Sequence, residues 1–220
     1  MEENLPVQNK LFGKTFFWMF LGLLGTAIVA WYTYASGLYV QIVWDGAFGF
    51  LLIIELIAVL LFSFLFRKLP PIAVGILYFV YAMLNGVTLS VVFAVYELGS
   101  IVILFIVAAL LYGALALVGY YTKHDLSSWK PYLTVFLLAG ILLSLVNLFL
   151  KNGTFDLILD WFILILFFGI TIYDINKMKA FQTDETLNQE KIHIYCAMQL
   201  YLDFINIFLR ILSLFGKKRS

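Results

Sequence analysis

The sequence has little charge and very few cysteines or histidines. Only 12% of its 220 residues are Asp, Glu, Lys or Arg, and the formal net charge is +1. We expect no nucleic-acid partner, because a near-neutral chain offers no basic surface to a phosphate backbone. The single cysteine, Cys196, excludes an intrachain disulfide and a cysteine-based metal site. His124 and His193 have no second metal-binding side chain at ligand spacing, so we expect no cofactor.

Apolar residues, in contrast, make up 64% of the chain, and the mean hydropathy is +1.00. An ordinary soluble domain is about half apolar and about one quarter charged. Seven apolar runs are each long enough to cross a hydrocarbon core of about 30 Å as a helix. They are Phe16–Ala35, Ala47–Phe66, Pro71–Tyr96, Ile101–Tyr121, Pro131–Leu150, Leu157–Tyr173 and Ile194–Phe215. The sequence therefore predicts an all-α membrane protein, with seven transmembrane helices in one polytopic domain over residues 1–220 and the lipid bilayer around it.

Lysine and arginine are distributed unevenly between the two ends of these runs. Nine of them precede the first run or follow the second, fourth and sixth runs: Lys10, Lys14, Arg67, Lys68, Lys123, Lys130, Lys177, Lys179 and Lys191. Basic residues are enriched on the cytoplasmic side, which predicts a cytoplasmic N-terminus. The basic tail Lys217–Arg219 conflicts with this pattern if the seventh run crosses fully. Either the tail is a tolerated exception or the last helix is re-entrant; we favour the crossing, because the run is long enough.

The seventh run carries a polar stripe. Gln199, Asp203, Asn206 and Arg210 recur at helical spacing and so share one face. A charge at the bilayer centre costs about 2.5–3.5 kcal/mol even on the most permissive scale. We therefore expect this helix at the centre of the protein, with the stripe facing other helices or water.

Asp203 and Asp174 are the most informative ionisable residues. Asp203 lies about 14 Å into the seventh run at the helical rise of about 1.5 Å per residue, close to the bilayer midplane. Asp174 ends the sixth run, but nothing stops that helix before Lys179. The polar segment 176–193 joins the two runs and should make them neighbours, so we expect the carboxylates to meet.

Two carboxylates brought together in a dry site share one proton and titrate as a unit. Such a pair would sense protons and could bind a hard cation such as calcium through its oxygens. Two structural alternatives remain open. Asp174 could cap a helix end near Lys177, and Asp203 could pair with Arg210 as packing.

Glu55 is a further acidic residue within an apolar run. No basic residue lies within one turn of it, so we expect it to be protonated or hydrogen-bonded to another helix. Gly113 and Gly119 in the fourth run favour close helix packing.

Several segments together resemble the Bax inhibitor family, the transmembrane Bax-inhibitor-motif proteins. The most specific are Tyr173-Asp174 at the end of the sixth run and Leu200-Tyr201-Leu202-Asp203-Phe204-Ile205-Asn206 in the seventh. Supporting segments are Glu55, Asn85-Gly86-Val87-Thr88-Leu89 and Lys123-His124-Asp125-Leu126-Ser127. The resemblance covers nearly the whole chain and is closest to the short prokaryotic members.

The resemblance implies two three-helix layers around a central C-terminal helix, in a bacterial inner membrane. It also implies a calcium leak that responds to pH, with protons and calcium as ligands and the paired aspartates at Asp174 and Asp203. Arg67, or Lys68 in its place, is the candidate latch; Glu55, Asn206 and Arg210 would support the site. Some bacterial relatives are instead linked to membrane proteases as modulators.

The residues and the resemblance leave three functional hypotheses to test. The first is a pH-sensitive calcium leak channel. The second is a regulatory membrane protein that modulates a membrane protease or another channel. The third is an intramembrane aspartyl hydrolase, but Asp203 follows Tyr201-Leu202 and not the Gly-x-Gly of those enzymes, and their Pro-Ala-Leu segment is missing. We therefore expect no enzyme.

Overall fold

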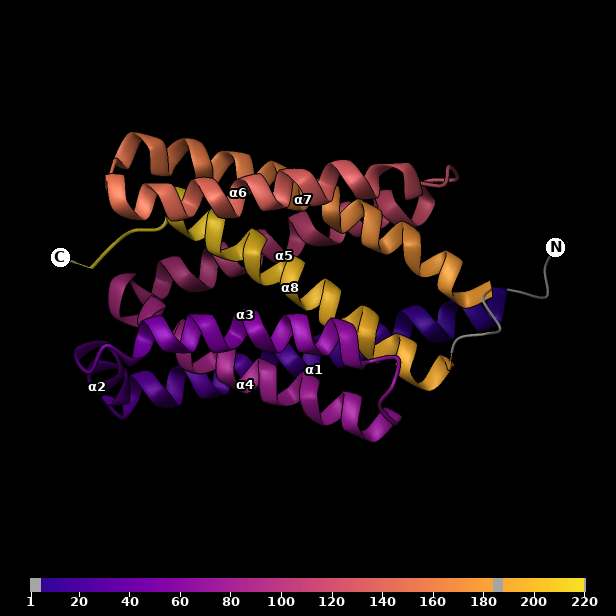
Figure 1. Ribbon diagram of the computed structural model, residues 1–220, viewed down its shortest axis with the longest axis horizontal. Helices are drawn as coiled ribbons and strands as arrows, with labels where there is room; N and C mark the ends of the chain where they lie inside the picture. The colour runs from indigo at the N-terminus through magenta and orange to yellow at the C-terminus, as the bar shows by residue number, and fades with distance from the viewer. Residues whose placement is uncertain (1–4, 184–187, 220) are drawn as a thin grey trace. The chain divides into compact units, whose positions relative to one another are not determined.

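The computed structural model describes residues 5–183 and 188–219. These residues are nearly all helical and contain no strand (Figure 1). Seven of their helices are long and apolar enough to cross a membrane, which confirms the predicted all-α fold and its seven spans. The elements are α1 (Leu5–Ala35), α2 (Leu38–Trp44), α3 (Ala47–Leu65), α4 (Pro71–Val95), α5 (Leu98–Tyr121), η1 (Ser127–Trp129), α6 (Lys130–Leu150), α7 (Gly153–Thr183) and α8 (Gln189–Phe215).

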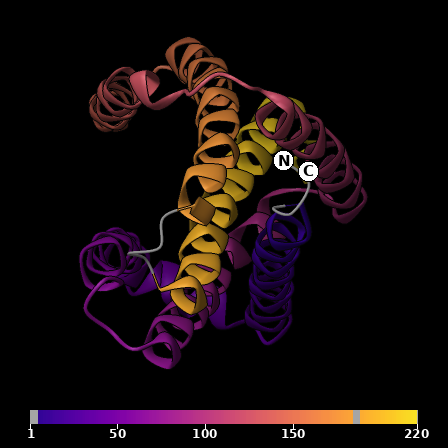
Figure 2. The ribbon, with the colours of Figure 1, turned by 90° about the vertical axis from the view of Figure 1, so that its right-hand side faces the viewer.

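The chain divides into two compact units. The first contains α1 to α4, the beginning of α8 up to Tyr201, and the end of the chain from Lys218. The second contains α5 to α7 and the remainder of α8 from Leu202. Each unit therefore holds three of the seven spans and part of α8, which Figure 2 shows as one continuous helix. More than half of the α8 span is buried, the largest share of any span, as its polar stripe predicted. The central position of α8 stays a prediction.

The first unit is built on the packing of α1 against α4, with α3 also lying on α4. Gly86 of α4 is the point of closest approach. A Cβ there would lie 2.7 Å from the backbone oxygen of Thr26 and 2.9 Å from Cβ of Val29, both on α1. Only a glycine allows two helix backbones to come this near. The short helix α2 was not predicted, because its seven residues are too few to cross a bilayer.

In the second unit α6 packs along α7, and α5 approaches α7 at Gly119. A Cβ on Gly119 would lie 2.7 Å from the backbone oxygen of Ile172. Gly113 has no atom within 4 Å of such a Cβ, so the expectation of close packing is right for Gly119 and wrong for Gly113.

The segment 176–193 is not the polar loop that the sequence predicted. Helix α7 continues to Thr183 and α8 begins at Gln189, so most of this segment is helical. It contains no glycine or proline to stop a helix. Its polar side chains indicate where α7 and α8 leave the apolar layer of the membrane. Both helices continue beyond that point. Asp174 consequently lies well inside α7.

Candidate functional site

Three polar side chains from three helices of the second unit act on one another. They are Tyr112 of α5, Asp174 of α7 and Asp203 of α8. Tyr112 and Asp203 are only 4% and 2% exposed, and Asp174 is half-buried. Asp174 and Asp203 lie within electrostatic range of each other, and Tyr112 lies within range of both carboxylates. The structure thus brings together the two aspartates that the sequence singled out and adds a tyrosine that it did not.

Two atoms of this cluster are buried without a hydrogen bond. Within the described part of the chain, neither Oδ2 of Asp203 nor the hydroxyl oxygen of Tyr112 has a partner. Oδ2 of Asp203 therefore forms no hydrogen bond to Asp174. An unpartnered buried polar atom costs about 1–3 kcal/mol. A proton or a cation bound at Oδ2 of Asp203 would remove this cost.

Asp174 does not cap a helix end, because α7 runs on to Thr183. Its neighbour one turn away, Lys177, interacts with it electrostatically. The Lys177 ammonium lies 5.6 Å from the ring centre of Tyr173 and 5.1 Å from that of Phe181. These contacts place the ammonium over aromatic faces on its own helix, where it attracts the Asp174 carboxylate from a distance.

Arg210 pairs with Asp160, and not with Asp203 as one sequence interpretation held. Nη1 of Arg210 lies 2.6 Å from Oδ1 of Asp160, and the Ser213 hydroxyl donates to Oδ2 of the same carboxylate at 2.5 Å. Asp160 is the fourth residue of the sixth apolar run, a position near the run's end that indicates contact with water, but it is only 7% exposed. The pair forms because α7 and α8 place both charges at the same depth in the second unit. It leaves Asp203 without a basic partner on its own helix.

The other polar residues of the stripe on α8 are satisfied locally. Asn206 donates from Nδ2 to the backbone oxygen of Leu202 at 2.8 Å. Gln199 donates to the hydroxyl of Tyr195 at 3.0 Å, one turn earlier. Asn206 therefore supports its own helix, and its supporting role at the aspartates stays a prediction.

Glu55 heads a hydrogen-bonded network in the first unit. Its two oxygens accept from Thr88 at 2.5 Å and from Asn85 at 3.2 Å, both on α4. Oδ1 of Asn85 accepts from the Tyr201 hydroxyl at 3.0 Å, and that hydroxyl lies 2.7 Å from the hydroxyl oxygen of Thr26. The network links α3, α4, α8 and α1, so the expectation of a bond from Glu55 to another helix is confirmed. Asn85 and Thr88 both lie in the segment that resembles the family.

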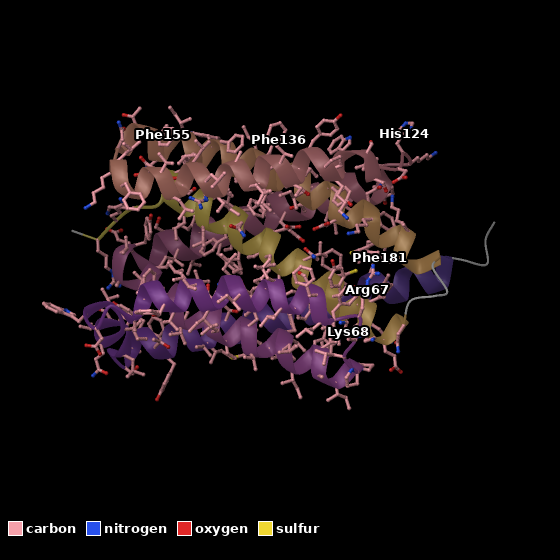
Figure 3. All side chains as sticks on the ribbon, in the orientation of Figure 1. Arg67, Lys68, His124, Phe136, Phe155 and Phe181 are labelled. Carbon is pink, nitrogen blue, oxygen red and sulfur yellow. The ribbon has the colours of Figure 1, made fainter. Side chains whose placement is uncertain are left out.

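The candidate latch residues lie on the turn after α3. Figure 3 labels Arg67 and Lys68 near the end of α3. Both are exposed, and the Arg67 guanidinium lies 5.8 Å from the ring centre of Phe66. The Lys191 ammonium donates to the backbone oxygens of Arg67 and Leu69 at 3.0 and 2.9 Å. A cation there complements the negative end of α3. Lys191 thus holds the turn in place, and the latch stays a prediction.

The loop between α5 and α6 is fastened to α7 close to Asp174. The side chain of Asn176 accepts from the backbone of Leu126 and donates to the oxygen of Thr122, which also accepts from Lys179. Asp125 accepts from the amide and hydroxyl of Ser127, and these bonds hold the pKa of its carboxyl below the usual range. The Lys123–Ser127 segment therefore has a structural role, because its bonds shape this loop and fasten it to α7.

The aspartate cluster could hold a cation only loosely. The described residues contain no group of three or more His, Cys, Asp or Glu side chains that could bind a metal ion. Calcium takes six to eight oxygen ligands, and two carboxylates supply only part of that number. Water or backbone oxygens would have to complete the shell.

A comparison with protein-family models decides the family. The model of the family described as "Inhibitor of apoptosis-promoting Bax1" matches residues 8–220. The chain belongs to the Bax inhibitor family. It is 38% identical to the inner membrane protein YbhL of Escherichia coli K12 over 208 residues, which cover 92% of this chain and 89% of YbhL. It is 31% identical to a protein of Borreliella burgdorferi over 100% of this chain and 97% of that one, and 31% identical to the protein RP147 of Rickettsia prowazekii over 94% and 89%.

Membership of the Bax inhibitor family, together with the seven apolar spans, makes the chain a multi-pass membrane protein.

Sequence reasoning missed two polar residues of the second unit, Tyr112 and Asp160. Tyr112 was overlooked because it lies in an otherwise apolar run, where its hydroxyl is the only side-chain polar group between Ser100 and Tyr120. Asp160 was overlooked because its distance from the helix end indicated water. A search for polar atoms in the sixth run at the depth of Arg210 would have found it.

Proposed function

We propose that this member of the Bax inhibitor family is a pH-sensitive calcium leak channel, with Asp174 and Asp203 forming one site for protons and calcium. The observation that carries the proposal is the buried carboxylate of Asp203, whose Oδ2 has no hydrogen-bond partner among the described residues, within electrostatic range of Asp174. Mid-membrane ionisable residues generally mark ion or proton pathways. The protein would act in a bacterial inner membrane with its N-terminus in the cytoplasm.

Proton binding and calcium binding compete at such a pair. Two interacting carboxylates in a site of low polarity hold one proton between them and titrate as a unit. Loss of that proton leaves two negative charges close together, and a cation relieves their repulsion. Arg210 cannot supply the cation because Asp160 holds it at 2.6 Å. Lys177 attracts Asp174 from one turn away but forms no salt bridge to it among the described residues, so we expect calcium to supply the further positive charge.

The Tyr112 hydroxyl fits a supporting part in this competition. It interacts with both carboxylates and has no hydrogen-bond partner among the described residues. A hydroxyl can donate to a carboxylate or offer its oxygen to a cation. It would therefore assist whichever ligand is bound. Conduction requires a site that binds an ion weakly enough to release it, and this small donor set meets that requirement.

The test is calcium flux into liposomes that contain only this protein. The wild-type flux should change with pH across the neutral range. Asp174→Asn and Asp203→Asn each remove a titrating group while keeping the shape of the side chain, so each should lose most of this pH dependence. The double variant should be little worse than either single variant, because members of one unit are not additive.

The matched control is Asp45→Asn, which removes an exposed carboxylate on the turn after α2 and should keep the wild-type pH profile. If both single variants at the site keep that profile as well, the pair is structural and the proposed gating is wrong. If the wild-type protein carries no calcium at any pH, the remaining candidate is a regulator of a membrane protease or another channel.

A further inference from the structure

A groove in the first unit is lined by side chains of α1, α4 and α8 and has a volume of about 800 Å³. Its lining includes Trp18 of α1 and Gly75, Ile76, Phe79 and Val80 of α4. The lining is almost entirely apolar. Its polar members, Glu190 and His193, both come from the first two turns of α8. Small-molecule sites commonly have this size, with an apolar lining and a few polar groups.

The groove runs along one leaflet of the bilayer. On α4 it extends from Pro71 to Met83, which is about 18 Å at the helical rise of about 1.5 Å per residue. Half of a hydrocarbon core of about 30 Å is about 15 Å. Ile72, Ile76 and Val80 line it and are 78%, 58% and 57% exposed, on a span that crosses the membrane. The groove therefore opens toward hydrocarbon, and an acyl chain fits it better than water.

Opposite charges lie at the end of the groove where α4 and α8 begin. Glu190 is exposed in the first turn of α8, one turn before His193. His193 is buried with its ring centre 6.0 Å from that of Trp18. Lys14 is exposed one turn before Trp18 on α1, so it lies on the same face of that helix. A carboxylate and an ammonium at the interface complement a headgroup that carries both an ammonium and a phosphate.

We propose that this groove binds one phospholipid with an ethanolamine headgroup. Its acyl chain lies along the exposed apolar face of α4 beside Trp18, which itself packs on Phe79 with ring centres 5.4 Å apart. Its ammonium donates to Glu190, and its phosphate faces Lys14. A phosphoglycerol lipid would fill the groove equally well. It lacks the ammonium, however, so its phosphate could still face Lys14 but Glu190 would meet no positive charge. The selectivity for one headgroup therefore depends on Glu190.

The test is native mass spectrometry of the full-length protein in detergent, after addition of equal amounts of ethanolamine and phosphoglycerol lipids with identical acyl chains. The wild-type protein should retain one lipid and favour ethanolamine by roughly two- to fivefold, the range expected of one interfacial ion pair. Glu190→Gln should bring this ratio close to one while the amount of retained lipid stays the same. Ile76→Trp should fill the groove and lower the retention of both lipids.

Ile103→Trp is the matched control, because Ile103 is 62% exposed on α5 and does not line the groove. It should bind lipid like the wild-type protein. Equal retention in the two tryptophan variants would overturn the groove as the binding site. A ratio of one in the wild-type protein, or an unchanged preference in Glu190→Gln, would overturn the headgroup contact.

Discussion

Replacing Gly119 with alanine should force α5 away from α7 beside the aspartate site. The new Cβ would lie 2.7 Å from the backbone oxygen of Ile172, 2.9 Å from Cβ of Ile175 and 3.1 Å from its Cγ2. A backbone oxygen and a branched Cβ cannot rotate out of the way as the end of a flexible side chain can. The helices must therefore separate, and overpacking of this kind costs about 1–3 kcal/mol.

Gly113 on the same helix makes it possible to isolate this cost. Alanine at either position gains up to about 1 kcal/mol of helix propensity over glycine. A Cβ on Gly113, however, meets nothing within 4 Å. The propensity gain cancels when the two variants are compared. The free energy of unfolding of Gly119→Ala should therefore be lower than that of Gly113→Ala by about 1–3 kcal/mol.

The assay is reversible unfolding in mixed micelles with increasing SDS, applied to the wild-type protein and both variants. Calcium flux adds a second measurement, because Ile175 directly follows Asp174 and Tyr112 lies two turns before Gly119 on α5. Gly119→Ala should alter the pH profile of the flux, and Gly113→Ala should leave it unchanged. Equal free energies of unfolding for the two variants would refute the close approach of α5 and α7 as a source of stability.

Two further changes test the hydrogen-bonded clusters by the same unfolding assay. Asp160→Asn should lower the free energy of unfolding by about 1–3 kcal/mol, since it leaves a partly exposed Arg210 without its partner. Combining it with Arg210→Gln should recover at least half of the loss, and a double variant as unstable as the sum of the two single ones would contradict an interacting pair. Tyr201→Phe removes a fully buried hydroxyl with partners at 2.7 and 3.0 Å and should cost about 1–3 kcal/mol. Tyr132→Phe, at a tyrosine that is 67% exposed, should cost nothing measurable, and equal costs at the two positions would argue against the network.

The seven spans could be predicted from the sequence because their signal is local. Each span is a run of residues whose transfer into hydrocarbon is favourable, and the free energies of transfer add along the run. The positions of Pro71 and Pro131 in the first turns of α4 and α6 follow from the same local chemistry, since proline lacks only an N–H that a helix start does not use. The helix ends were less predictable. The polar ends of α7 and α8 project beyond the apolar layer, where hydropathy no longer reports on helix formation.

The sequence alone also determined which face of α8 is polar, because the helical period places Asp203 and Arg210 on one stripe. Only the tertiary structure decided what each of these side chains meets. Arg210 pairs with Asp160, Asp203 interacts with Asp174 and Tyr112, and Glu55 bonds to Asn85. Those partnerships depend on the depth and rotation of neighbouring helices, which are set by close approaches such as that of Gly119 to Ile172. A helical period determines the direction of a side chain from its own axis but carries no information about the distance to the next helix.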